Sequence, residues 1–190
     1  MSRLTPKQKR MKQLWNMIAR LVAYVVGLGV VITLGILFVK YFGMQTVVID
    51  ESMSPILQSE DVVLIDSLSF KTRDPKRMDI VSIKIGSARS SPSYVRRIIG
   101  IPGDTVRITG GMVYVNDEKV TFPSTEELVD LAGTAEEGIT LGEGMYFVMC
   151  DDYNNTHDDS RLDSIGMISS DQIKGKVWMI MAPLSRLKKL

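Results

Sequence analysis

The chain has 190 residues, a formal net charge of +1 and an apolar fraction of 45%. This length suits one membrane segment and a globular part of one or two small domains. The single cysteine excludes an intrachain disulfide, and the sequence contains no phosphate-binding loop and no His, Cys or carboxylate cluster with metal-ligand spacing. We therefore expect neither a metal nor another cofactor.

Charge is unevenly distributed along the chain. Residues 1–20 carry six basic side chains and no acidic one. Seven of the 23 basic residues lie at or before Lys40, which leaves 16 for the rest of the chain, against all 22 acidic residues. The N-terminal tail is thus basic and the remainder acidic, which argues against nucleic acid as a partner.

The stretch Leu21–Val39 contains no charged residue. Its nineteen positions approach the ~20 residues needed to cross the hydrocarbon core of a bilayer. The alternative is a cleaved secretory signal, whose apolar core is usually about 7–15 residues long. The longer run, followed by the poor cleavage sequence Lys40-Tyr41-Phe42, favours a retained transmembrane helix. The basic tail predicts that residues 1–20 stay in the cytoplasm and that residues 41–190 face outward from the cytoplasmic membrane.

Beyond the span, short β-branched runs between turn residues predict a mostly β domain. We expect strands at 47–49, 62–65, 80–85, 94–99, 106–108, 112–115, 119–122 and 145–150. Ser124 and Glu127 have the spacing of a capping box and predict one short helix that ends at Gly133.

Two stretches stand out chemically. In Asp50-Glu-Ser-Met-Ser-Pro-Ile-Leu57 the proline ends regular strand pairing, which predicts that Ser52 lies half exposed at a strand end. In Tyr94-Val-Arg-Arg-Ile-Ile-Gly-Ile-Pro-Gly-Asp104 the pattern predicts a strand and then a tight turn.

Together these stretches resemble the type I signal peptidase family, the membrane-anchored serine proteases that remove signal peptides. The short box Met78-Asp-Ile-Val81 also resembles that family. The resemblance implies that Ser52, followed by Met53, occupies the position of the nucleophile. It also places Arg96 where the family has a lysine that acts as general base.

Two departures from the family bear on catalysis. A buried lysine can lose its proton and activate a serine, whereas arginine keeps its proton at any pH that proteins survive. Asp50 replaces a glycine or serine near the site of the oxyanion, and a carboxylate there would repel the developing negative charge. These substitutions suggest a serine endopeptidase relative that is non-catalytic or weakly active.

A third box begins after the strand that ends at Cys150, and in it Asp151, Asn155 and Asp159-Ser160-Arg161 fit the family pattern. The resemblance puts Thr156 in place of a serine that hydrogen-bonds the lysine. It also implies that Asp159 pairs with Arg161 to support the site. Asp158 is an alternative partner of Arg161, and a third interpretation is an acidic loop that is only solvated surface. His157 is the only histidine; it is either an exposed loop residue or a replacement base.

The resemblance implies a signal-peptidase-type antiparallel β core over 44–104 and 142–183, with a small β-rich insert at 105–141. The implied partners are the lipid bilayer and exported precursor proteins or their signal peptides. A non-catalytic member would bind exported proteins and assist assembly of surface proteins or pilus subunits. The alternatives are an active signal peptidase that uses Ser52 with a non-standard base, and an anchored domain without a peptide groove.

Overall fold

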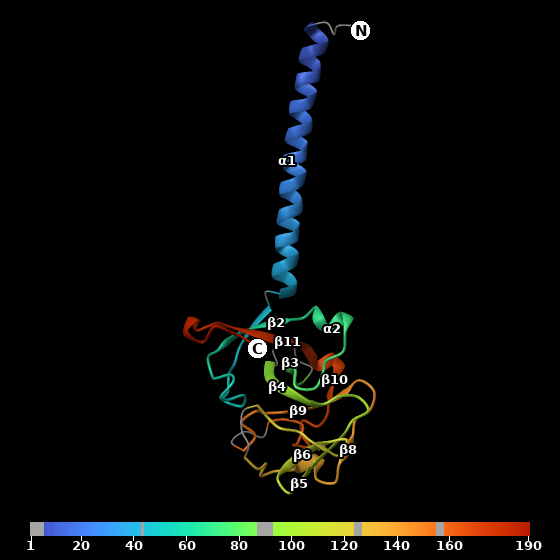
Figure 1. The fold of residues 1–190 in the computed structure, drawn as a ribbon, viewed down its shortest axis with the longest axis vertical. Coiled ribbons are helices and arrows are strands. Elements are labelled where there is room, and N and C mark those ends of the chain that lie inside the picture. Colours follow the sequence, from blue (N-terminus) through green and yellow to red (C-terminus); the bar gives the residue numbers. More distant parts are fainter. Residues whose placement is uncertain (1–5, 43, 87–92, 124–126, 155–157) are drawn as a thin grey trace. The chain divides into compact units, whose positions relative to one another are not determined.

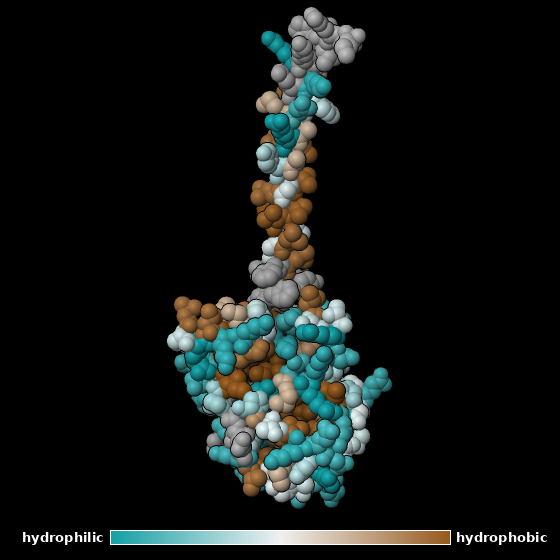
Figure 2. Space-filling model, viewed as in Figure 1, coloured by the Kyte–Doolittle hydropathy of each residue, from teal (hydrophilic) through white to brown (hydrophobic). Residues whose placement is uncertain are grey.

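A computed structural model describes residues 6–42, 44–86, 93–123, 127–154 and 158–190. The chain divides into two compact units, residues 1–40 and 41–190. Most of the first unit belongs to helix α1 (Pro6–Phe42), whose last two residues lie beyond that unit and in which Arg10–Leu37 is long and apolar enough to cross a membrane. Figure 2 shows apolar side chains along the part of α1 that follows its hydrophilic N-terminal turns. The predicted span Leu21–Val39 lies within this helix, which is consistent with a membrane-anchored protein.

The larger sheet of the second unit is antiparallel throughout (Figure 1). Its strand order is β1-β2-β11-β3-β4-β9-β10, and β12 pairs with β11. Its strands are β1 (Met44–Val47), β2 (Val62–Asp66), β3 (Ile80–Lys84), β4 (Ser93–Gly100), β9 (Met145–Met149), β10 (Ile168–Ser169), β11 (Ile173–Ala182) and β12 (Lys188–Lys189). The strands adjacent in space are often distant in sequence, which brings the loop after β1 and the middle of β4 into one region.

A second, four-stranded sheet has the order β7-β6-β5-β8. It contains β5 (Thr105–Thr109), β6 (Met112–Val115), β7 (Glu118–Lys119) and β8 (Ile139–Thr140), all from the segment expected to form the insert. The mostly β fold predicted from the sequence is therefore confirmed.

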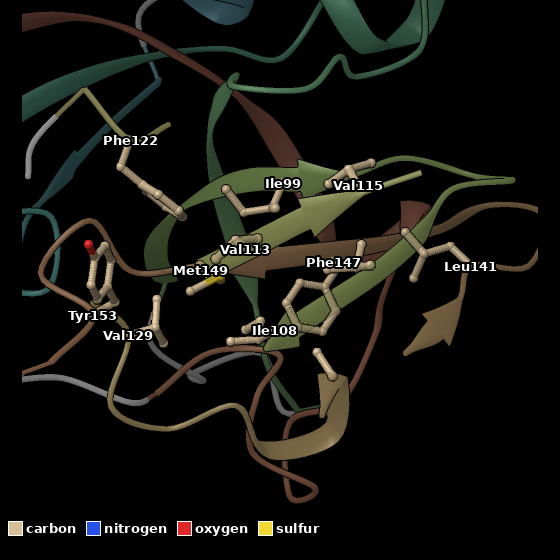
Figure 3. Packing of buried hydrophobic residues seen from close by; sticks show 12 residues of the cluster. Ile99, Ile108, Val113, Val115, Phe122, Val129, Leu141, Phe147, Met149 and Tyr153 are labelled. Carbon is tan, nitrogen blue, oxygen red and sulfur yellow. The ribbon is translucent and has the colours of Figure 1, made fainter. Parts of the chain in front are cut away.

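The two sheets share a hydrophobic cluster (Figure 3). Alternation along β5 buries Val106 and Ile108, while Phe147 and Met149 enter the same cluster from β9. The ring of Phe122 lies edge-on to that of Tyr153, with 5.0 Å between ring centroids. The insert therefore has no separate core and is stabilised by burial against the larger sheet.

Three predicted elements are wrong: the strand at 119–122, of which only Lys119 lies in β7, the helix after Glu127, and the bounds of the first strand. No helix follows Glu127; among the residues described here, only a 3₁₀ turn, η1 (Gly133–Ala135), lies near its expected end. The main-chain N–H of Val129 instead donates to Gly111 O at 2.8 Å, so a tertiary contact replaces the helical hydrogen bond. The capping-box residues 124–126 lie outside the described part of the chain.

The first strand is also displaced from its expected position. It ends at Val47, because Val48 N donates to Asp61 O at 2.9 Å within the loop that carries Ser52. The remaining short elements are α2 (Ser69–Thr72), η2 (Ser170–Gln172) and η3 (Leu184–Arg186).

Candidate functional site

Ser52 lies in the loop between β1 and β2 and is fully buried. The expectation of half exposure is therefore wrong. Two neighbouring apolar side chains, Met53 and Leu57, enter the core and draw the loop onto the sheet, and Leu57 N donates to Met53 O at 2.9 Å. The main-chain N–H of Asp152 donates to Ser52 O at 2.9 Å and covers the serine from the other side.

Arg96 projects from β4 and is also fully buried. Its Nη1 donates to Ser52 Oγ at 2.7 Å and to Val95 O at 2.7 Å, and its Nε donates to Asp158 O at 2.8 Å. The guanidinium carbon lies 5.3 Å from the centroid of the Tyr94 ring. Because these contacts hold the guanidinium directly against the serine oxygen, the position expected for a general base is filled by a permanently charged hydrogen-bond donor.

Asp50 completes the arrangement. Its Oδ1 accepts hydrogen bonds from the Ser52 hydroxyl and, at 3.2 Å, from Ser52 N, while its Oδ2 lies 3.5 Å from Arg96 Nη2. The carboxylate expected to repel the developing charge of the oxyanion is paired with the arginine, and its side chain is 30% exposed.

The chemical capacity of this triad is limited. The serine hydroxyl donates to a carboxylate and accepts from a guanidinium, so both its proton and a lone pair are occupied. A carboxylate accepts a proton far less readily than a neutral lysine amine, as the reference pKa values of the two residue types indicate. The geometry therefore binds and orients the hydroxyl and provides little driving force for its deprotonation.

A second buried ion pair, which was not predicted from the sequence, joins Arg97 to Asp151. Arg97 Nε donates to Asp151 Oδ1 at 2.6 Å and Nη2 donates to Oδ2 at 2.5 Å, while Nη1 donates to Met78 O at 2.9 Å. Burial raises the pKa of the Asp151 carboxyl, and the two Arg97 contacts oppose that shift. The sequence signal that could have predicted this pair is the basic dipeptide in β4 together with an aspartate directly after the buried strand β9.

A third ion pair supports the loop after β9. Arg161 Nε donates to Asp159 Oδ1 at 2.9 Å and Nη2 donates to Oδ2 at 2.8 Å, and both side chains are fully buried. Asp159 Oδ2 also accepts from Cys150 N at 2.9 Å. Of the two candidate aspartates it is Asp159 that faces Arg161, whereas Asp158 has an exposed side chain and contributes its main-chain carbonyl to Arg96.

The remaining candidates are Thr156, His157 and Cys150. Thr156 and His157 lie outside the described residues. The Cys150 thiol is buried, and this burial raises its pKa, which keeps it protonated. The described residues contain no group of three or more His, Cys, Asp or Glu side chains that could hold a metal ion.

Comparison with known proteins identifies the family. Residues 18–182 match the model of the signal peptidase family, peptidase S26. The chain is 30% identical over 168 residues to signal peptidase I U of Bacillus subtilis, with 84% of each chain covered. It is 26% identical over 183 residues to signal peptidase IB of Staphylococcus aureus, which covers 88% of this chain and 93% of that protein.

A solved structure is also similar. The signal peptidase I of Enterococcus faecalis V583 is 27% identical with a TM-score of 0.44, and the match covers 55% of this chain and 97% of that one. The match of the family model across most of the chain confirms the resemblance carried by the boxes around Ser52 and Arg96. The chain belongs to the signal peptidase family, peptidase S26.

Proposed function

We propose that this protein is a membrane-anchored signal-peptidase-like binding protein with little or no peptidase activity. It binds extended segments of exported precursor proteins at the outer face of the cytoplasmic membrane and assists assembly of surface proteins or pilus subunits. The observation that carries this proposal is the position of Ser52 Oγ, which accepts from Arg96 Nη1 at 2.7 Å and donates to Asp50. Family membership supplies the partner class, since signal peptidases act on precursors that carry signal peptides.

The edge of the larger sheet supports peptide binding. β1 is the terminal strand of its sheet and pairs only with β2 within the described part of the chain. Val47 and Ile49, on the segment that leads to Ser52, are 48% and 57% exposed. An extended peptide that adds to this edge would gain main-chain hydrogen bonds from β1 and apolar contacts from these side chains.

The second candidate function is an active peptidase with Asp50 as an unusual proton acceptor. The hydrogen bond from the Ser52 hydroxyl to Asp50 favours it, because a base must lie within hydrogen-bond reach of the proton that it takes. The ion pair with Arg96 argues against it, because the carboxylate is already engaged by the guanidinium, with 3.5 Å between Asp50 Oδ2 and Arg96 Nη2.

A photo-crosslinking experiment tests the binding function. A photoreactive phenylalanine analogue is placed at Ile49 in the full chain, in membranes of cells that export precursor proteins. We expect adducts that contain exported proteins, because this position borders the open strand edge. The matched control is Leu128, which is similarly exposed at 62% but lies in the insert. Equal adducts at both positions, or none at Ile49, would contradict peptide binding at the edge.

The orientation has its own test. Residues 1–20 carry six basic side chains and no acid, and basic flanks stay in the cytoplasm. Protease added outside intact cells should therefore digest residues 41–190 and leave an epitope on the N-terminal tail intact. Protection of the globular unit until the cells are lysed would reverse the assignment.

A further inference from the structure

Three hydrogen-bond donors converge on one carboxylate at the site. They are the main-chain N–H of Ser52, its hydroxyl, and the Arg96 guanidinium, and all three face the side chain of Asp50. A guanidinium, a main-chain N–H and a hydroxyl are the groups with which proteins hold carboxylates and other anions. Asp50 therefore occupies the place that a bound anion would take.

The donors are held by contacts that do not involve Asp50. Arg96 is fixed by the carbonyl oxygens of Val95 and Asp158, at 2.7 and 2.8 Å, and by the ring of Tyr94. The Ser52 carbonyl accepts from Asp152 N at 2.9 Å. Both donor residues are fully buried, whereas the Asp50 side chain is 30% exposed. Removal of Asp50 should thus leave a preformed set of donors around an opening toward solvent.

We propose that Ser52 and Arg96 form a carboxylate-binding site and that Asp50 is its built-in ligand. Asp50 closes the site both to free carboxylates and to the carbonyl oxygen of a peptide lying along β1, because either would need the Ser52 N–H that Asp50 already holds. This inference rests on the proposed function, since it explains how the protein holds a peptide without presenting its carbonyl to Ser52. The ligand class of the opened site is a monocarboxylate, including the C-terminal carboxylate of a peptide.

The test is chemical rescue of an Asp50→Ala variant of the full chain in detergent. The melting temperature of the globular unit is followed in sodium formate and in sodium chloride at equal ionic strength. In chloride the variant should melt about 5 °C or more below the unaltered protein, because the buried guanidinium loses its counter-charge. Formate should restore the loss with a saturable dependence on the order of millimolar, as suits a ligand of three non-hydrogen atoms.

Two controls identify the site. The unaltered protein should melt at the same temperature in both salts, because Asp50 fills the position. The double variant Asp50→Ala with Arg96→Met should not respond to formate, because the guanidinium is absent.

A short peptide with a free C-terminal carboxylate should stabilise Asp50→Ala more than the same peptide with a C-terminal amide.

The same effect of formate and chloride on Asp50→Ala would overturn the inference, as would an equal formate effect on the unaltered protein. If Asp50→Ala does not fold in chloride, purification in formate becomes the measurement. Soluble protein with formate alone supports the site, and aggregation in both salts refutes it. Since the readout uses neither a precursor nor peptide cleavage, its failure would leave the crosslinking test of the proposed function unaffected.

Discussion

Purified full-length protein in detergent is expected to leave a signal-peptide-bearing precursor essentially uncleaved. Arg96 cannot accept the proton of Ser52, and loss of a general base typically costs on the order of 10²–10⁴-fold in rate. We expect Asp50 to lower the rate further, because its carboxylate would repel the negative charge of the oxyanion and accepts the Ser52 N–H. The measurement is the amount of mature product over time, beside an equal concentration of Ser52→Ala.

The restoring variants make this expectation specific. Arg96→Lys alone should stay inactive, because Asp50 lies beside this position, with its Oδ2 3.5 Å from Arg96 Nη2, and would favour the charged form of the new amine. Arg96→Lys with Asp50→Gly removes both obstacles and is the variant in which cleavage is expected. Cleavage by the unaltered chain that disappears in Ser52→Ala would refute the non-catalytic proposal, and an added His157→Ala change would then test the histidine as base.

The second large effect is expected at the Asp159 and Arg161 pair. Both side chains are fully buried, so Asp159→Ala removes the carboxylate counter-charge of a guanidinium inside the protein, which keeps its bond to Tyr153 O, and removes the acceptor of Cys150 N. Removal of one partner of a buried ion pair costs about 3–5 kcal/mol. For a chain of this size that loss lowers the melting temperature by about 6–20 °C. Thermal denaturation followed by near-ultraviolet circular dichroism measures it.

An exposed ion pair of this chain is the matched control. Arg107 Nη2 lies 3.0 Å from Asp117 Oδ1, but the two side chains are 46% and 88% exposed. Solvent screens such a pair, so Arg107→Gln should change the stability by less than about 1 kcal/mol. A melting temperature for Asp159→Ala within the range of this control would show that the buried pair contributes little to stability.

The sequence predicted the larger strands and the membrane span because the signals for these elements are local. The strands expected at 62–65, 80–85 and 94–99 correspond to β2, β3 and β4, because β-branched runs between turn residues are a local signal. The uncharged run Leu21–Val39 is likewise a local signal and lies within α1.

What the sequence did not predict depends on contacts between distant segments. Ser52 is buried in part through the contact with Asp152, a hundred residues further along the chain, and the bond between Val129 and Gly111 replaces the helix expected after Glu127. The pairing of Asp50 with Arg96 is of the same kind. In the fold the carboxylate of Asp50 and the guanidinium of Arg96 both contact Ser52 and pair with each other.

The main-chain contacts around Ser52 have a consequence for how this site changes under mutation. Ser52 O accepts from the amide of Asp152, and Arg96 donates to the carbonyls of Val95 and Asp158. Carbonyl groups are present whatever the side chain, and the N–H is present in every residue except proline, so exchange of the side chains of Val95, Asp152 and Asp158 leaves these main-chain contacts available. The side chains at positions 50, 52 and 96 can therefore change during evolution while the main-chain contacts around them are kept. The same substitutions can be reversed by mutagenesis without changing those main-chain contacts.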